Sequence, residues 1–309
     1  MKYESKNKIR NETIRYKYYG FFESDTAFWN CHHSLYGYDT LLLGESIVAM
    51  FFFMSGYGLS MSKKKITKSL VIHRVSRLLV PFALSIILFQ LASLICGNMM
   101  LSQLPMSKNL TEGIGLILPN SWFVYAIVLF YAIFHILFYA LKGKGLKYIT
   151  LFFAMMIYIK LMAKFVVGEH WHITALAFCS GAVYKEVAKR VNGMQNILFF
   201  FLLTIVIILM NFVFKNFYLR IFFFALMPIV ICSVLSNVGL KTNKTIAWLR
   251  TISYPIYLVH GIVIFLYCHF HLEGIMSLSW GLLLVLGTTI PIAYIVSLLE
   301  KKVQFKCFA

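Results

Sequence analysis

The sequence predicts an all-α, polytopic membrane helical bundle, and two observations lead to this prediction. The chain has 309 residues, of which 60% are apolar and only 13% are charged, and its mean hydropathy is +0.78. Its apolar runs repeatedly reach the roughly 20 residues that a helix needs to cross about 30 Å of hydrocarbon. These runs do not alternate between polar and apolar residues as barrel strands do, so the spans are predicted to be helices.

Nine spans are predicted, each an apolar run between polar or basic segments. Their approximate limits are 40–62, 78–97, 121–141, 148–166, 171–184, 196–214, 221–238, 253–270 and 280–299. The fifth run is short and contains Gly181, which predicts a tilted or kinked helix. Residues 18–38 are rich in aromatics but contain Glu23 and Asp25. A carboxylate costs about 2.5–3.5 kcal/mol at a helix centre, so this stretch is either a degenerate or truncated first helix or an interfacial segment.

Lysine and arginine gather in alternate loops, and this predicts the orientation of the chain. Eighteen lie in one set of segments, 63–77, 142–147, 185–195, 239–250 and the tail from 301, whereas three lie in the other loops. The first set is therefore predicted to be cytoplasmic, with the C-terminus inside. Nine spans would then put the N-terminus outside, although residues 1–17 are basic. A tenth crossing within 18–38 would resolve this conflict. The predicted division is a basic N-terminal segment, 1–38, and a multi-spanning domain, 39–309.

The net charge of +18 does not predict a nucleic-acid partner. Basic loops of a membrane protein set its orientation and face anionic lipid headgroups, so membrane lipid is the expected partner. The six cysteines have no CxxC spacing and are interpreted as small apolar residues. Neither a metal nor a disulfide is predicted.

Several local patterns follow one another along the chain. They are His32-His33, the FFFMSGYG run of 51–58, Arg74-Val-Ser-Arg77, Leu-Leu-Val-Pro81-Phe, the SWFVY run of 121–125, His170-Trp171-His172, and the SYPIYLVH run of 253–260. In order, spacing and topology they resemble the membrane acyltransferase-3 family, integral-membrane enzymes that O-acylate bacterial glycans. The resemblance covers about residues 30–300. It implies a ten-span bundle with a histidine after the first helix, whereas here the apolar helix before that histidine is missing.

The resemblance implies that His33 is the catalytic histidine, with His32 as the alternative register. Histidine suits the removal of a proton from a sugar hydroxyl because its unperturbed pKa is near neutrality. A carboxylate can orient the ring and stabilise the imidazolium, and Asp39 and Glu45 are the nearest in sequence. Because Glu45 lies inside a predicted span, it is expected to face a polar cavity or to be paired. The alternative interpretation of His32-His33 is an interfacial polar pair.

Arg74 and Arg77 match the arginine pair of the family. Their spacing predicts one shared helix face, and guanidinium groups suit the phosphates of a coenzyme A thioester on the cytosolic side. The alternative is snorkelling at a helix end.

Substrate-binding candidates are Trp122, Tyr125, Trp171, His172 and His260. The aromatic residues are interpreted either as interfacial anchors or as surfaces for a sugar ring, and His260 either as a substrate contact or as a helix-packing histidine. The glycines in Ser55-Gly56-Tyr57-Gly58 allow close approach of a ligand or of another helix.

The function implied by the resemblance is O-acyl transfer, most often O-acetyl transfer. The donor would be cytoplasmic acetyl-CoA, and the acceptor a hydroxyl of an extracytoplasmic envelope glycan or lipid-linked glycan at the bacterial plasma membrane. The alternatives are a lipid-glycan transporter and a non-catalytic, degenerate family member. A transporter predicts an internal repeat, and none is visible in the sequence. A degenerate member would lack the geometry around His33, and the missing first helix keeps this alternative open.

Overall fold

The computed structural model describes residues 41–61, 68–95, 118, 121–165, 171–191, 198, 201–202, 205, 217–238, 243–270, 272 and 275–308. The eight helices of this part of the chain are α3 (Leu41–Ser60), α4 (Lys68–Ile95), α6 (Ser121–Ala140), α7 (Lys144–Phe165), α8 (Leu176–Val191), α10 (Phe217–Val238), α11 (Lys244–His269) and α12 (Leu278–Phe308). No strand occurs among the described residues. The all-α prediction is confirmed.

Eight of the nine predicted spans coincide with described helices, and six of these helices are long and apolar enough to cross a membrane. The remaining predicted span, 196–214, has only four described positions, and the degenerate first helix at 18–38 lies outside the described residues. The division at residue 38 therefore stays a prediction.

The helices extend past the apolar runs that predicted them. Helix α4 begins at Lys68, ahead of the predicted start near 78, so both arginines of the pair are helical. Helix α11 begins at Lys244, where the Ile246 amide donates to Asn243 Oδ1 at 2.8 Å, the hydrogen bond of an N-cap. An apolar run measures only the length that crosses hydrocarbon, and a capped helix continues into the polar region beyond it.

The fifth predicted span is shifted along the chain. Helix α8 spans Leu176–Val191, and Trp171–Ala175 form a buried turn that leads into it. The Trp171 carbonyl accepts a hydrogen bond from the Tyr158 hydroxyl at 2.8 Å. Non-helical backbone is tolerated at membrane depth only where protein covers it, and every residue from 171 to 179 is buried.

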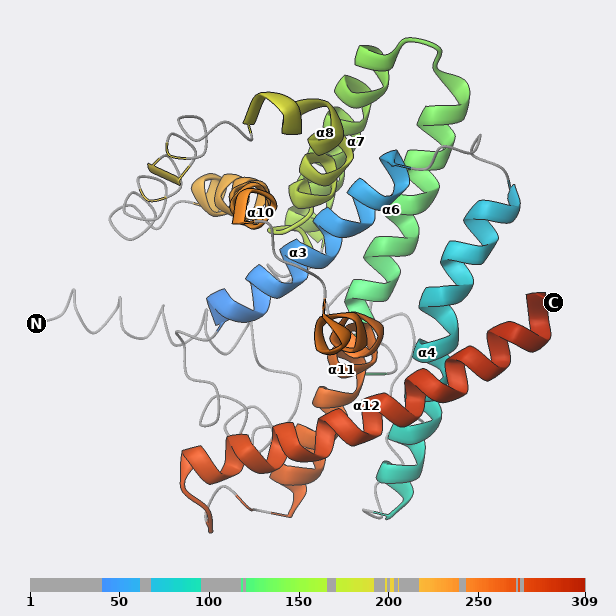
Figure 1. The fold of residues 1–309 in the computed structure, drawn as a ribbon, viewed down its shortest axis with the longest axis vertical. Helices are drawn as coiled ribbons and strands as arrows, with labels where there is room; N and C mark the ends of the chain where they lie inside the picture. Colours follow the sequence, from blue (N-terminus) through green and yellow to red (C-terminus); the bar gives the residue numbers. More distant parts are fainter. Residues whose placement is uncertain are drawn as a thin grey trace, which may run out of the picture.

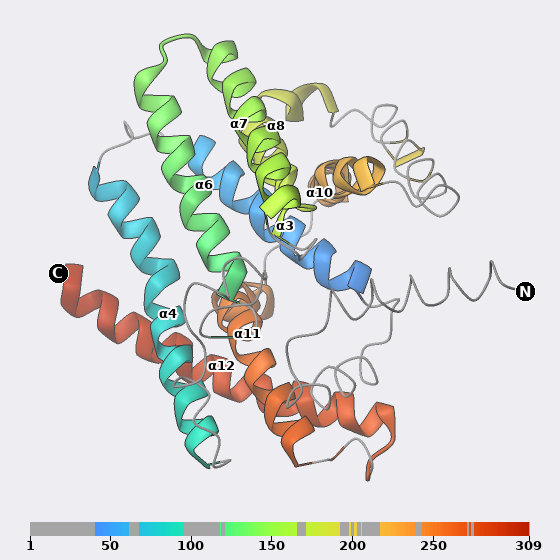
Figure 2. The same ribbon diagram turned by 180° about the vertical axis from the view of Figure 1, so that it is seen from behind.

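The helices form two groups that meet near the middle of the bundle (Figure 1). In the first group α3 packs on α8, α10 and α6, and in the second group α11 packs on α12 and α4. The α6–α7 connection lies at one end of the molecule and the α11–α12 connection at the opposite end, as Figure 2 also shows from behind. These two connections thus lie at opposite ends, as predicted for these two loops.

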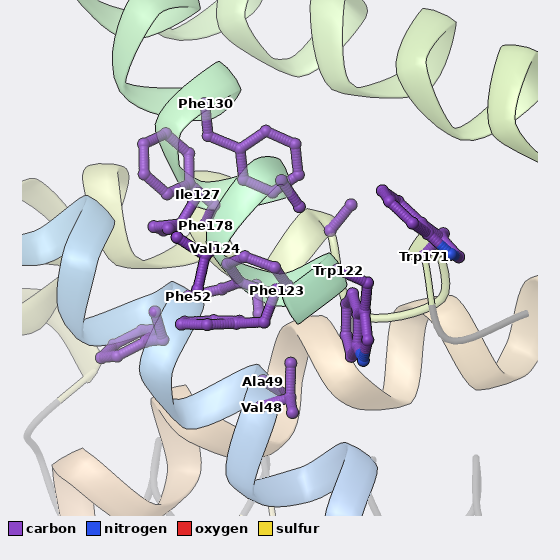
Figure 3. Close-up of a cluster of buried hydrophobic side chains, with 14 of the residues drawn as sticks. Val48, Ala49, Phe52, Trp122, Phe123, Val124, Ile127, Phe130, Trp171 and Phe178 are labelled. Atoms are coloured by element: carbon purple, nitrogen blue, oxygen red, sulfur yellow. The ribbon is translucent and has the colours of Figure 1, made fainter. Parts of the chain in front are cut away.

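Aromatic rings of α3, α6 and α8 pack together in a core (Figure 3). Phe52 lies 4.9 Å from Phe123 and 5.0 Å from Phe130 between ring centroids, and all three are buried. The Tyr257 ring of α11 reaches this core at 5.2 Å from Phe123 and 5.7 Å from Phe51. Helix α11 is therefore held against α3 and α6 by ring contacts.

Two glycines set the crossing of α3 and α8. A Cβ added to Gly56 would collide with the Phe178 carbonyl oxygen, and one added to Gly181 would collide with the backbone of Phe53. The helices therefore touch backbone to backbone, as small residues permit in membrane bundles. Gly56 serves helix packing, which was one of the two interpretations of this glycine.

Candidate functional site

The structure describes eight of the ten predicted site residues. His33 and Asp39 lie outside the described residues, as does His32. The other eight are Glu45 on α3, Arg74 and Arg77 on α4, Trp122 and Tyr125 on α6, Trp171 and His172 in the turn before α8, and His260 on α11.

Glu45 is paired across the bundle with Arg220. Arg220 Nη2 lies 3.2 Å from Glu45 Oε2 and 3.4 Å from Oε1, and the exposed fractions of the two side chains are 27% and 15%. The pair joins the N-terminal part of α3 to the first turn of α10. Of the two expectations for Glu45, the structure shows pairing. A carboxylate neutralised in this way is tolerated inside a span.

Removing either member of this pair is expected to destabilise the protein. The pair is partly buried, so the loss should fall at about 1–3 kcal/mol, between the values for exposed and fully buried pairs. In Glu45→Gln or Arg220→Gln the partner's charge is left without this neutralisation. The thermal midpoint of the detergent-solubilised protein measures the effect.

The charge-reversed double variant, Glu45→Arg with Arg220→Glu, is the control for this prediction. It should restore much of the thermal midpoint because opposite charges again meet. If neither single variant lowers the midpoint, the pair contributes nothing to stability.

The two arginines of the pair differ in their surroundings. Arg74 is half-buried and donates from Nη2 to the Gly58 carbonyl near the end of α3 at 2.7 Å. Arg77, three residues later, is exposed. That the two arginines share one helix face stays a prediction, and of the two only Arg74 donates to α3.

Hydroxyl groups from other helices lie close to Arg74. The Tyr131 hydroxyl of α6 is hydrogen-bonded to Ser55 of α3 and lies within the field of the Arg74 charge. The Tyr254 hydroxyl of α11 donates to the Leu78 carbonyl of α4 at 3.1 Å. Side chains from α3, α4 and α6, namely Ser55, Arg74 and Tyr131, therefore form one polar group, the Arg74 cluster, inside the bundle.

The predicted aromatic site residues are mostly interior. Trp122 and Trp171 are 8% and 5% exposed, and their ring centroids are 6.2 Å apart (Figure 3). Tyr125 is half-buried, packs edge-on against Phe82 at 6.1 Å, and is hydrogen-bonded to Ser121. The structure thus brings the two tryptophan rings together, whereas the Tyr125 ring packs against Phe82.

The two histidines of the set lie apart in different packing environments. His172 is 3% exposed, and its ring centroid lies 5.2 Å from that of Phe217 at the start of α10. His260 is half-buried, with Nδ1 3.3 Å from the Ile256 carbonyl of its own helix and its ring 5.7 Å from Tyr257. Across the described residues, no group of three or more metal-ligating side chains occurs.

Sequence reasoning missed Arg220 and Tyr131. Arg220 is one of only three basic residues in the loops predicted to face outward, and that isolation was a usable signal. Tyr131 lies in an almost wholly apolar, aromatic span, where one hydroxyl among many rings carries no local signal.

Residues 16–298 match the model of the acyltransferase-3 family, described as an acyltransferase domain, and the match includes His33, both arginines and the residues of the Arg74 cluster. Neither a curated protein nor a solved structure matches the chain significantly. Since the family match covers most of the chain and the structure is a bundle of apolar helices, this protein belongs to the acyltransferase-3 family and is a multi-pass membrane acyltransferase.

Proposed function

We propose that this protein transfers an acyl group, most often acetyl, from acetyl-CoA to a hydroxyl of an extracytoplasmic glycan or lipid-linked glycan. Its location would be the bacterial plasma membrane, with the C-terminus in the cytoplasm. The family assignment supports acyl transfer. The donor, acceptor and orientation rest on the distribution of charge and on the positions of the polar groups.

The observation that carries the proposal is the placement of polar groups at the two ends of α3. The Glu45–Arg220 pair lies near its N-terminal end, and Arg74 meets it at Gly58. The helix between positions 45 and 58 is about 20 Å long at 1.5 Å per residue, a large part of the roughly 30 Å hydrocarbon core. A donor held near Arg74 and an acceptor held near Glu45 would thus be on opposite sides of the hydrocarbon core. The arm of the donor that carries the acyl group would follow α3 between them.

The chemistry assigned to the residues is general-base acyl transfer. His33 takes the proton of the acceptor hydroxyl, the oxygen attacks the thioester carbonyl, the C–S bond breaks, and the thiolate leaves and is protonated. Glu45 or Asp39 supports the imidazolium. Arg74 and Arg77 serve the phosphate end of the donor, and Trp122, Tyr125, Trp171, His172 and His260 are proposed around the acceptor and the acyl path. The bundle chiefly supplies positioning and exclusion of water.

Transfer from labelled acetyl-CoA tests the proposal. Membranes that contain the protein are incubated with the donor and a panel of envelope glycans, and membranes with the His33→Ala variant are the matched control. The expected result is a labelled glycan from which alkaline hydroxylamine releases the label, because the bond is an ester. Equal labelling in the two membranes would overturn the proposed reaction and favour the non-catalytic alternative.

The orientation predicts which loops are reached by reagents. Gly143 and Ser277 are exposed and lie in connections at opposite ends of the bundle. In a variant without native cysteines, Ser277→Cys should react with a membrane-impermeant maleimide in intact cells, whereas Gly143→Cys should react only after the cells are opened. The opposite pattern would invert the orientation and with it the cytoplasmic donor.

A further inference from the structure

Arg74 occupies a position where the end of α3 requires a donor. The last four carbonyl groups of a helix have no intrahelical partner, and Gly58 belongs to the last turn of α3. Arg74 Nη2 donates to that carbonyl at 2.7 Å, and the adjacent Tyr57 carbonyl accepts from the Met61 amide at 2.9 Å. A guanidinium also suits this place because the C-terminal end of a helix carries partial negative charge.

A second contact holds the same turn from another helix. The Ser55 side chain, three residues before Gly58, is hydrogen-bonded to the Tyr131 hydroxyl, and the Arg74 charge acts on Tyr131. The C-terminal part of α3 is thereby tied to α4 through Arg74 and to α6 through Tyr131. Loss of Arg74 removes one of these ties together with its hydrogen bond to the Gly58 carbonyl.

The guanidinium group of Arg77 is more accessible to a phosphate ligand than that of Arg74. The side chain of Arg77 is exposed, whereas Arg74 is half-buried against α3. Binding a phosphate through the guanidinium fork requires that at least two N–H groups face the ligand. Arg74 already directs one terminal nitrogen to the Gly58 carbonyl.

We infer that the arginine pair is divided in function, with Arg74 as a positioning residue and Arg77 as the ligand of the donor's phosphates. Arg74 holds the C-terminal turn of α3, together with Tyr131, so that the path along α3 keeps its shape. Arg77 supplies the charge that distinguishes a phosphate-bearing thioester from one without phosphates. This inference rests on the proposed function and narrows its donor side from both arginines to Arg77 as the phosphate contact.

Thermal unfolding of the purified, full-length protein separates the two roles, and it needs no acceptor. The midpoint is measured without ligand and across a titration of coenzyme A, with pantetheine, which has the same thiol arm but no phosphate, as the second probe. A ligand that binds only the folded state raises the midpoint according to its dissociation constant. The variants are Arg74→Lys, Arg74→Gln and Arg77→Gln, and the control is Arg250→Gln, an exposed arginine of α11.

The proposed division of roles predicts opposite effects for substitutions of Arg77 and of Arg74. Arg77→Gln should keep the unliganded midpoint but weaken coenzyme A about tenfold or more, the size of a lost charge-assisted hydrogen bond, with pantetheine unaffected. Arg74→Gln should lower the unliganded midpoint, and Arg74→Lys should recover part of it because an ammonium can still donate to the Gly58 carbonyl. Coenzyme A should bind Arg74→Lys within about threefold of the parent, the range that separates an indirect effect from a lost charge-assisted contact.

Other outcomes overturn the inference and can be told apart from failure of the proposed function. If Arg74→Lys keeps the unliganded midpoint but loses coenzyme A binding, Arg74 is itself a donor ligand. If the Arg77→Gln variant binds coenzyme A as tightly as the parent does, Arg77 is not the phosphate contact. The same follows if Arg250→Gln weakens coenzyme A binding as much as Arg77→Gln does. If the parent protein is not stabilised by coenzyme A at all, the proposed donor is wrong, and the role of Arg77 falls with it.

Discussion

Replacing Gly181 with alanine is expected to prevent α3 and α8 from reaching their native separation. The added methyl group would meet the carbonyl oxygen, carbonyl carbon and Cα of Phe53, all of them backbone atoms. Backbone cannot rotate aside as the end of a long side chain can, so the helices must move apart. Overpacking in a close-packed interior costs about 1–3 kcal/mol and sometimes more, and a backbone collision belongs at the upper end.

The measured quantities are the thermal midpoint in detergent and the fraction of monodisperse protein after extraction. Both should fall strongly in Gly181→Ala and in Gly56→Ala, whose methyl group would meet the Phe178 carbonyl. Gly44→Ala is the matched control on α3, because its Cβ would meet nothing within 4 Å. Alanine also favours a helix over glycine by about 1 kcal/mol, so this control should be neutral or stabilising. A native midpoint in Gly181→Ala would contradict the backbone contact.

The helical class and eight of the nine predicted spans were predictable because crossing hydrocarbon requires a long apolar run. The positions of the turns were less predictable. Residues 171–175 lie in a predicted span but form a buried turn, because the sequence pattern reports burial and not backbone conformation. The start of α11 was missed because Lys244 lies in a polar loop, where Asn243 as an N-cap determines the boundary.

The site was predictable only in part, because its contacts join distant segments. Glu45 was identified as a span carboxylate that needs a partner or a polar cavity, but its partner Arg220 is 175 residues away in the sequence. The spacing of Arg74 and Arg77 predicts a shared face and does not show that only Arg74 turns onto α3. That difference depends on how α3 and α4 cross, which a single sequence does not encode in any local pattern.

Replacing His33 with alanine is expected to have the largest effect on acyl transfer. A positioned general base typically accelerates a reaction by about 10²–10⁴-fold, so kcat should fall by that factor while the thermal midpoint stays near that of the parent. His33 lies outside the described residues but within the part of the chain that matches the family. The measurement is transfer from labelled acetyl-CoA at saturating donor.

His32→Ala is the matched control because it removes a neighbouring histidine without removing the proposed base. It should keep activity within a few-fold of the parent, whereas loss in His32→Ala and retention in His33→Ala would shift the register by one residue. His260→Ala provides a control within the described bundle, where the ring contacts Tyr257 and its own helix carbonyl. It should change the stability or the KM more than the pH dependence of kcat.

The pH profile adds a test that a purely structural histidine would not pass. A base acts in its neutral form, so activity should be present above the pKa of His33 and be lost as the pH falls through it, near 6.5 if the ring is unperturbed. In His33→Ala the residual activity should lose this dependence, because the titrating group is gone. If the parent shows no inflection between about pH 5 and 8, or if His33→Ala keeps it, another group removes the proton. Activity lost equally from all three histidine variants would instead indicate damage to the bundle, which the thermal midpoint would reveal.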